Sequence, residues 1–282
     1  MDFISLLKAE CSLDTSLKGK YVKHADSNYD LRKLWLDGKI ELYQAFQGRD
    51  VFNCDYIISF IGEGNDKARF IGIYDVISKK DAKDCNLSEE EKAEVFAGEA
   101  NFFYELKKRS GYEKLENSVI ISWGGSQQWH HRVDNTTKEV WQIYPSGFYS
   151  DFPGTEKIML SFSELCFILK NKEANKDWYA TLSNLNGVYL ILDKLTGKQY
   201  IGSAYGHEGI WGRWTEYMNT NGTGNNKQLE ELISEDSNYA IKYFQYTLLR
   251  ALPKALTKDQ VIAQEAFLKN CLGARAFGLN SN

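Results

Sequence analysis

Proline is scarce in this sequence, with 3 among 282 residues, and no Pro-rich or low-complexity tract interrupts it. This composition argues against long disordered segments. No run of about 18 consecutive apolar residues occurs, so we expect no transmembrane helix. The first eight residues lack both a basic stretch and a long apolar core, so we expect no signal peptide.

Paired cysteines are also lacking. The five cysteines stand singly, without a Cys-x-x-Cys pair, and their odd number argues against a disulfide framework. We therefore expect a cytoplasmic protein whose thiols are mostly buried. A net charge of −4 shows no excess of basic residues, which is mild evidence against nucleic-acid binding. Net charge describes long-range steering, however, and does not exclude local basic patches.

The length predicts about two domains. In the first, residues 1–170, we expect an α+β fold with a curved, mostly antiparallel sheet. The predicted strands are residues 55–60, 68–76, 118–123 and 138–144, with a turn at 62–66. The predicted helical segments are part of 1–20, 31–36, a stretch containing Ala93, Phe96 and Ala97, and one through Phe103 and Leu106.

The second domain, residues 171–282, is predicted to begin with a linker helix, and the boundary falls near 170–185. Two helices, 161–170 and 173–183, bridge the domains. Further helices are expected at 210–218 and 227–234, and a strand at 239–249. Thr257 and Gln260 form a capping box that starts a helix ending near Cys271.

Residues 187–202 read as a β-hairpin, because two apolar segments flank a short polar turn. Gly197 ends the turn and is free to take a left-handed conformation. If Asp193 pairs with Lys198, Ile191 lies opposite Tyr200.

In that register Tyr189 is the diagonal neighbour of Tyr200 on the same face, so two phenols converge there. Gly187 and Gly202 leave bare backbone beside them. We expect this bare backbone to admit another molecule.

Two charged residues interrupt apolar helix faces. Arg213 shares a face with Ile210, Trp214 and Tyr217, where an unpaired guanidinium would be costly. From the helix pattern alone, the expected partner is an internal carboxylate.

Glu265 similarly stands in a stripe with the apolar residues Val261, Leu268 and Leu272. An inward carboxylate needs a cation or a proton. Its predicted partner is Arg213 or a divalent metal, and both can hold in turn.

The hairpin halves, Gly187-Val188-Tyr189 and Tyr200-Ile201-Gly202, resemble the two halves of the GIY-YIG nuclease motif. The resemblance covers about the last hundred residues and implies a small α/β nuclease domain that hydrolyses DNA phosphodiesters. The catalytic residues that it implies are Tyr189, Tyr200, Arg213, Tyr217, Glu265 and Asn280.

The resemblance also assigns roles. Glu265 would hold Mg²⁺ or Mn²⁺, Arg213 would neutralise the phosphate oxygens, and Gly202 and Ser203 would lie against the substrate. Tyr200 is our choice for general base or water positioner, with Tyr189 and Tyr217 completing the network. A double-strand break would then need a homodimer or two successive events.

An N-terminal recognition domain joined to such a nuclease favours a restriction or phage-defence enzyme over repair or homing. The alternatives are an endonuclease acting on unmodified DNA and a non-catalytic nucleic-acid-binding protein that keeps the fold.

The stretch from Tyr43 to Val76 faintly resembles the PUA-like EVE domains that extrude one base. That resemblance implies a reader of modified cytosine. The candidate pocket walls are Trp123, Trp129, Trp141, Tyr43 and Phe46. The alternative for each aromatic residue is a place in the core.

Two other motifs do not indicate a binding site. The glycine-rich loop at 202–212 lacks Gly-Lys-Ser/Thr and is not a P-loop. His130 and His131 are neighbours in a predicted extended segment, so they point to opposite faces and are unsuited to share a metal.

Overall fold

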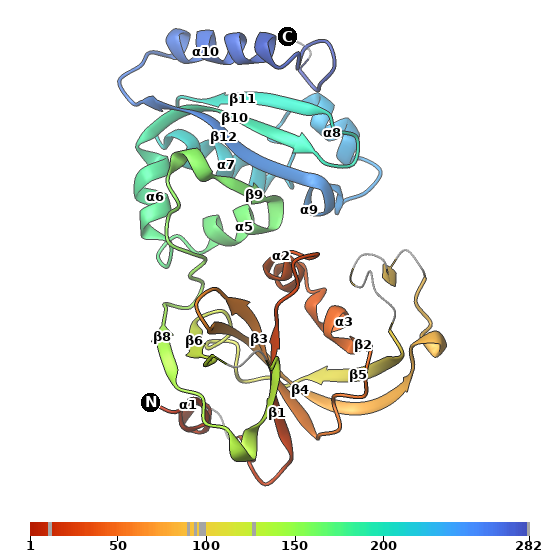
Figure 1. The fold of residues 1–282 in the computed structure, drawn as a ribbon. Helices are drawn as coiled ribbons and strands as arrows, with labels where there is room; N and C mark the ends of the chain where they lie inside the picture. Colours follow the sequence, from red (N-terminus) through yellow and green to blue (C-terminus); the bar gives the residue numbers. More distant parts are fainter. Residues whose placement is uncertain (11–12, 89–90, 93–94, 96–99, 126–127, 281–282) are drawn as a thin grey trace. The chain divides into compact units, whose positions relative to one another are not determined.

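The structure is a computed structural model that describes residues 1–10, 13–88, 91–92, 95, 100–125 and 128–280 (Figure 1). Its contacts divide the chain into two compact units, Met1–Phe148 and Tyr149–Asn282. Strand β9 (Met159–Ser161) pairs with β12 (Phe244–Pro253), so the stretch just before residue 170 belongs with the second unit. None of the described helices is long and apolar enough to cross a bilayer.

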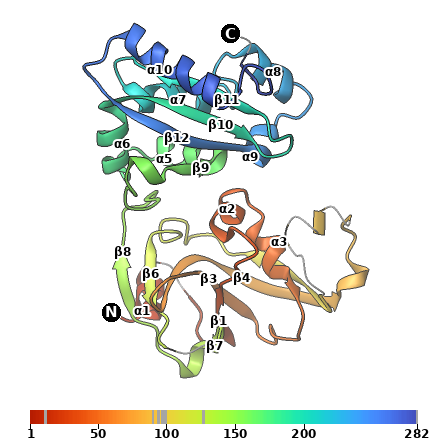
Figure 2. The ribbon, with the colours of Figure 1, turned by 45° about the horizontal axis from the view of Figure 1, so that its top comes forward.

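The first unit is built on a curled mixed sheet in the order β2-β5-β4-β3-β1-β7, with β6 joining β4 to β8 (Figures 1 and 2). Only the β1–β3 pair is parallel among the described pairs. The strands are β1 (Gly19–His24), β2 (Phe46–Gln47), β3 (Tyr56–Glu63), β4 (Lys67–Asp81), β5 (Phe102–Lys108), β6 (Val119–Ser122), β7 (His130–Arg132) and β8 (Val140–Ile143). The helices whose bounds the structure describes are α1 (Phe3–Glu10), α2 (Leu31–Leu36), α3 (Ile40–Ala45) and the 3₁₀ turns η1 (Ala82–Asp84) and η2 (Val133–Asn135).

These elements confirm the four predicted strands and the predicted helix at 31–36. The helix expected through Phe103 and Leu106 is wrong. That segment is β5, because its aromatic residues pair with the far half of β4. The predicted helical stretch at Ala93, Phe96 and Ala97 lies outside the described residues.

The core of the first unit lies on both faces of this sheet. Helix α1 contributes Phe3 and Leu7 to a cluster with Phe60 and Phe70. Helices α2 and α3 cover a second cluster around Ile71. Register shifts beside Ser59 and Val76 mark bulges, which bend strands and account for the curl.

The second unit is an antiparallel sheet in the order β11-β10-β12-β9 with helices on both faces (Figure 1). Its strands also include β10 (Leu185–Asp193) and β11 (Gln199–Ala204). Its helices are η3 (Thr155–Lys157), α5 (Phe162–Lys170), α6 (Lys176–Ser183), α7 (Gly209–Asn219), α8 (Lys227–Ile233), α9 (Tyr239–Tyr243) and α10 (Lys258–Cys271).

Alternation along β10 decides which helix covers which face. Val188 packs toward α10 in a cluster that includes Val261. Its neighbour Tyr189 points the other way and contacts Trp214 and Tyr217 of α7.

Most predicted elements of the second unit are confirmed, including the capping box of Thr257 and Gln260, in which each side chain bonds the other residue's backbone N–H. The strand expected over 239–249 is wrong for its first part. Residues 239–243 form α9, in which Ala240 is buried, and β12 begins only at Phe244.

Candidate active site

The predicted hairpin register is confirmed. The Asp193 N–H donates to the Lys198 carbonyl at 2.9 Å, and Ile191 lies opposite Tyr200. Gly197 has a φ of 73°, the left-handed conformation that the turn requires.

The expectation for the two bare glycines is wrong. A Cβ on Gly202 would lie 2.5 Å from the Tyr189 hydroxyl oxygen, and one on Gly187 would lie 2.7 Å from Ile210 Cδ1. The glycines therefore make room for the protein's own side chains, and Gly202 in particular leaves room for the phenol end of Tyr189 beside β11.

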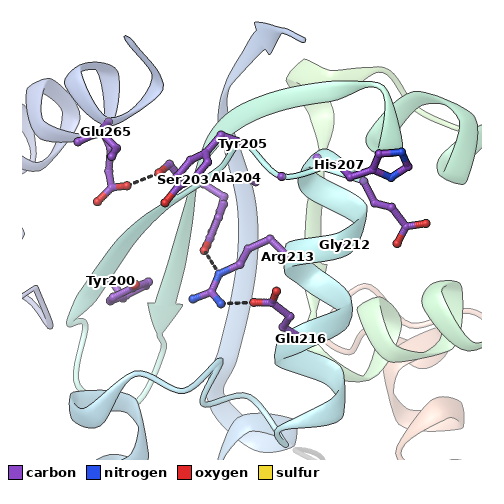
Figure 3. A pocket seen from close by; sticks show the side chains of 14 residues that line it. Tyr200, Ser203, Ala204, Tyr205, His207, Gly212, Arg213, Glu216 and Glu265 are labelled. Atoms are coloured by element: carbon purple, nitrogen blue, oxygen red, sulfur yellow. Dashed lines mark hydrogen bonds and ion pairs between the residues drawn. The ribbon is translucent and has the colours of Figure 1, made fainter. Parts of the chain in front are cut away.

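A cavity of 930 Å³ opens beside the hairpin and gathers residues from β10, β11, α7, α10 and the loop after β11 (Figure 3). Among its lining residues are five of the predicted site: Tyr189, Tyr200, Ser203, Arg213 and Glu265. Its other lining residues include Tyr205, His207, Glu208, Glu216 and Ile262, which the sequence did not suggest. Tyr217, Gly202 and Asn280 are not among the lining residues.

Arg213 is held by four groups at once. Its Nε donates to the Tyr189 hydroxyl at 3.1 Å, and its Nη2 donates to the Tyr217 hydroxyl and the Gly224 carbonyl, both at 3.2 Å. Its Nη1 bonds the Glu216 carboxylate (Figure 3). Burial alone lowers the pKa of Arg213, but the tyrosine oxygens and Glu216 outweigh burial and raise it above its usual value. The guanidinium is therefore a permanent cation in a fixed orientation.

The two phenols beside Arg213 differ in access. Tyr189 and Tyr217 are both fully buried, and their hydroxyl oxygens lie 3.0 Å apart. Burial raises both pKa values well above the usual value for tyrosine, so both are protonated in the free protein. Only Tyr189 of the two lines the cavity, and Tyr217 lies behind it with its hydroxyl hydrogen-bonded to both Tyr189 and Arg213.

Glu265 does not pair with Arg213, which corrects one of the two expected partners. Its Oε1 lies 2.6 Å from Lys269 Nζ, one turn further along α10, and its Oε2 accepts from the Ser203 hydroxyl (Figure 3). The Glu265 side chain is 17% exposed and that of Lys269 12% exposed. The expected apolar stripe is also incomplete, since Leu272 is exposed.

The oxygen atoms that line the cavity suit a hard divalent cation that takes few ligands from the protein and keeps several waters. The described residues contain no cluster of three or more His, Cys, Asp or Glu that would form an all-protein metal cage. Mg²⁺, however, commonly uses one or two carboxylates and keeps several waters. The cavity is lined by three carboxylates (Glu208, Glu216, Glu265) and one guanidinium, a balance that repels a phosphate unless a cation is added. Glu265, with the Ser203 hydroxyl beside it, would be the residue to hold such a cation.

Asn280 lies away from the cavity and pairs with backbone instead. Its Oδ1 accepts from the Ile201 N–H and its Nδ2 donates to the Ile201 carbonyl, both at 2.8 Å. β11 is an edge strand, so the side chain of Asn280 takes the place of a neighbouring strand. Asn280 thereby positions the backbone between Tyr200 and Gly202.

Replacing Asn280 with alanine is expected to lower the free energy of unfolding by about 1–3 kcal/mol, because two buried backbone groups lose their partners. Urea denaturation of the full chain measures this. The matched control is Asn184→Ala, at an exposed asparagine of the same unit. Equal stability of the two variants would show that Ile201 is not held by Asn280.

The five aromatic residues proposed as walls of one base pocket do not come together, which corrects that expectation. Trp123 is buried in one core cluster, Tyr43 and Phe46 belong to a second, and Trp129 to a third. Trp141 is 59% exposed, with Lys67 Nζ 4.0 Å from its ring centroid. Four of the five aromatic residues therefore pack in the core clusters of the first unit, and only Trp141 is exposed.

Both histidines of the pair contact tryptophan rings, and the described cysteines differ in their exposure. The ring centroids of His130 and Trp129 lie 4.8 Å apart, and those of His131 and Trp123 lie 5.1 Å apart. Cys85 is buried as expected, but Cys271 is exposed, which corrects the expectation for that thiol. Burial raises the pKa of Cys54 and of Cys166 to about 11.

Comparison with known proteins gives a limited result. No protein-family model and no curated protein matches the chain. Two solved structures match about a third of it. One is a mutant of the catalytic domain of the intron endonuclease I-TevI, with 24% identity over 35% of this chain and 94% of that domain and a TM-score of 0.28. The other is the catalytic domain of the homing endonuclease I-TevI, with 26% identity over 34% of this chain and 96% of that domain and a TM-score of 0.27.

Proposed function

We propose that this protein is a metal-dependent endonuclease that hydrolyses phosphodiester bonds in DNA. The observation that carries the proposal is the convergence of a guanidinium, two phenols and a carboxylate on one cavity, from Arg213, Tyr189, Tyr200 and Glu265. Phosphodiester hydrolysis needs neutralisation of the phosphate oxygens, a group that takes a proton from water, and stabilisation of the leaving oxygen. The cavity offers Arg213 for the first task and a tyrosine for the second, and a metal ion held by Glu265 would stabilise the leaving oxygen.

Arg213 is the phosphate-binding residue in this proposal. Its planar guanidinium suits two phosphate oxygens at once, and its bonds to Tyr189 and Tyr217 fix its orientation before the substrate arrives. A phosphate reaching Nη1 would displace the Glu216 carboxylate, whose side chain is mostly exposed and easily moved.

To accept a proton from water, one of the two tyrosines that line the cavity, Tyr189 or Tyr200, must first give its own hydroxyl proton to solvent and act as the phenolate. Burial keeps Tyr189 protonated in the free protein, and the nearby Arg213 favours its phenolate. Tyr200 lies on the same face and is only half-buried. Mg²⁺ or Mn²⁺, when held by Glu265 with Ser203 beside it, would supply charge neutralisation and a more acidic water.

Replacing Glu216 with glutamine is expected to tighten DNA binding about fivefold in the absence of divalent cations. The reason is that Arg213 loses a competing carboxylate worth about 1 kcal/mol. Fluorescence anisotropy with a labelled duplex in EDTA measures the affinity. Glu208→Gln is the matched control, because Glu208 lines the same cavity, whereas the hydrogen bonds of Arg213 go to Tyr189, Tyr217, Gly224 and Glu216. Equal tightening in both variants would show that only the change in net charge matters. It would contradict the claim that Glu216 competes with phosphate for Arg213.

Replacing Lys269 with methionine is expected to tighten Mn²⁺ binding about tenfold, because the ammonium at 2.6 Å competes with the metal for Glu265. Isothermal titration of the DNA-free protein with Mn²⁺ gives the affinity directly. Lys258→Met removes the same charge from the first turn of the same helix. An unchanged affinity in Lys269→Met would mean that Glu265 does not hold the metal.

For the biological role we propose restriction of foreign DNA, with the first unit as the recognition domain. Its support is that residues 1–148 form a compact unit with a core of their own. Recognition of modified cytosine is one form of this proposal, and cutting of unmodified DNA is the other.

The experiment is cleavage of three matched duplexes that carry cytosine, 5-methylcytosine or 5-hydroxymethylcytosine, each with Mg²⁺ and with EDTA. Cleavage of the modified duplexes alone supports a modified-base reader. Equal cleavage of all three contradicts that reader but keeps the endonuclease. Binding without cleavage of any duplex would leave a non-catalytic DNA-binding protein.

A further inference from the structure

A second cavity, of 430 Å³, lies within the first unit, beside the paired strands β1 and β7. Its charged or titratable lining residues are Lys18, Lys20, His130, His131, Arg132 and Asp134, together with the thiol of Cys54. Three permanent cations thus face one carboxylate, the opposite of the balance in the candidate active site.

The cations of this cavity are partly pre-arranged. Lys20 Nζ lies 2.6 Å from both the Val51 carbonyl and Asn53 Oδ1, which fix the ammonium without neutralising it. Lys20 and Arg132 are direct partners in the antiparallel β1–β7 ladder. Arg132 bonds Asp134, but both side chains are about 60% exposed, so this ion pair is weak and exchangeable.

His130 lies close enough to Lys20 for its pKa to be affected by that ammonium. Burial lowers the pKa of His130, and Lys20 lowers it further, so the imidazole is neutral near pH 7. A neutral imidazole still offers one N–H donor to an anion.

A metal ion does not suit this cavity, although His130, His131 and Cys54 line it. Burial raises the pKa of the Cys54 thiol to about 11, so the thiolate that a metal needs is not formed near neutral pH. The surrounding ammonium and guanidinium groups would repel a cation further. The chemistry of the lining therefore selects an anion.

We propose that this cavity binds a phosphate group of the DNA backbone. The proposal rests on the proposed function, because it supposes that DNA is the substrate. Lys18, Lys20 and Arg132 neutralise the phosphate, and His130 donates a hydrogen bond. Such a contact anchors and orients a duplex without reading its sequence. It also gives an acidic protein a local site for a polyanion.

The test is the salt dependence of DNA binding by the full chain in EDTA, where no cleavage occurs. The variant is Lys18→Gln with Arg132→Gln, at two exposed residues whose replacement leaves the core intact. The matched control is Lys83→Gln with Lys114→Gln, which removes the same charge from exposed positions of the same unit that do not line the cavity. A 30-base-pair duplex is titrated at NaCl concentrations from about 50 to 200 mM.

Loss of this one phosphate contact is expected to reduce the magnitude of the negative slope of log K against log salt by about 0.9 and to weaken binding about tenfold or more at low salt, while the control changes much less. An equal change in both double variants would contradict the proposal. Competition by inorganic phosphate with an unchanged DNA slope would also contradict it, since the cavity would then serve a small anion. DNA binding is measured without metal and is therefore independent of cleavage. If the salt dependence changes as expected but the protein does not cleave DNA, only the proposed nuclease activity is rejected.

Discussion

Replacing Glu265 with alanine is expected to lower the rate of DNA cleavage at millimolar Mg²⁺ by about 10³-fold or more, while DNA binding stays nearly unchanged. The carboxylate is the metal-holding group in our account, and a bound metal contributes several kcal/mol to the transition state. It contacts Ser203 and Lys269 and not Arg213, so the phosphate-binding group stays in place. Single-turnover cleavage and anisotropy measure the two quantities separately.

Removing Glu265 leaves the nearly buried Lys269 without its partner, so stability has to be controlled. Glu265→Gln keeps a hydrogen-bond acceptor for Ser203 and should be equally inactive, because an amide is a poor ligand for Mg²⁺. Glu231→Ala, at an exposed position of the same unit, should keep full activity. Wild-type cleavage rates in a folded Glu265→Gln protein would show that Glu265 does not bind the metal.

Replacing Arg213 with alanine is expected to lower the cleavage rate about 10²–10³-fold, as for the loss of one group that stabilises transition-state charge. Arg213→Lys should not restore activity. Nε and Nη2 of Arg213 reach the Tyr189 and Tyr217 hydroxyls at 3.1 and 3.2 Å, and an ammonium lacks this planar arrangement of donors.

The contrast between the two Arg213 variants is the informative part of this experiment. Circular dichroism and thermal unfolding exclude misfolding as a cause, since the side chain packs against the Tyr217 ring. Normal cleavage by Arg213→Lys would show that only a positive charge is needed at this position.

The hairpin and its phenols could be predicted because their determinants are local. The turn before Gly197 fixes the register, and the register places Tyr189 and Tyr200 on one face. The start of the final helix could also be predicted, because Thr257 and Gln260 stand at capping-box spacing.

An internal carboxylate was expected for Arg213, but neither Glu216 nor Lys269, the partner of Glu265, was identified. Glu216 stands three residues after Arg213, and Lys269 four residues after Glu265, spacings at which helix neighbours meet. That signal was present in the sequence. The choice between these neighbours and a long-range Arg213–Glu265 pair depends on tertiary placement, which spacing alone does not give.

The aromatic residues of the first unit show a different limit. Trp123 and Trp129 look like candidates for base stacking, yet each packs into a separate core cluster of the curled sheet. Residue type does not distinguish a stacking platform from a core position. The helix expected at Phe103 failed for a related reason, because pairing with β4 overrides a weak local preference.

Nicking of supercoiled plasmid DNA by the purified full chain tests the central claim most directly. We predict conversion to nicked or linear DNA with Mg²⁺ or Mn²⁺, none in EDTA, and none with a folded Glu265→Gln, Arg213→Ala double variant prepared in the same way. An intact plasmid after incubation of the wild-type protein with either metal would contradict the account, as would equal nicking by the double variant.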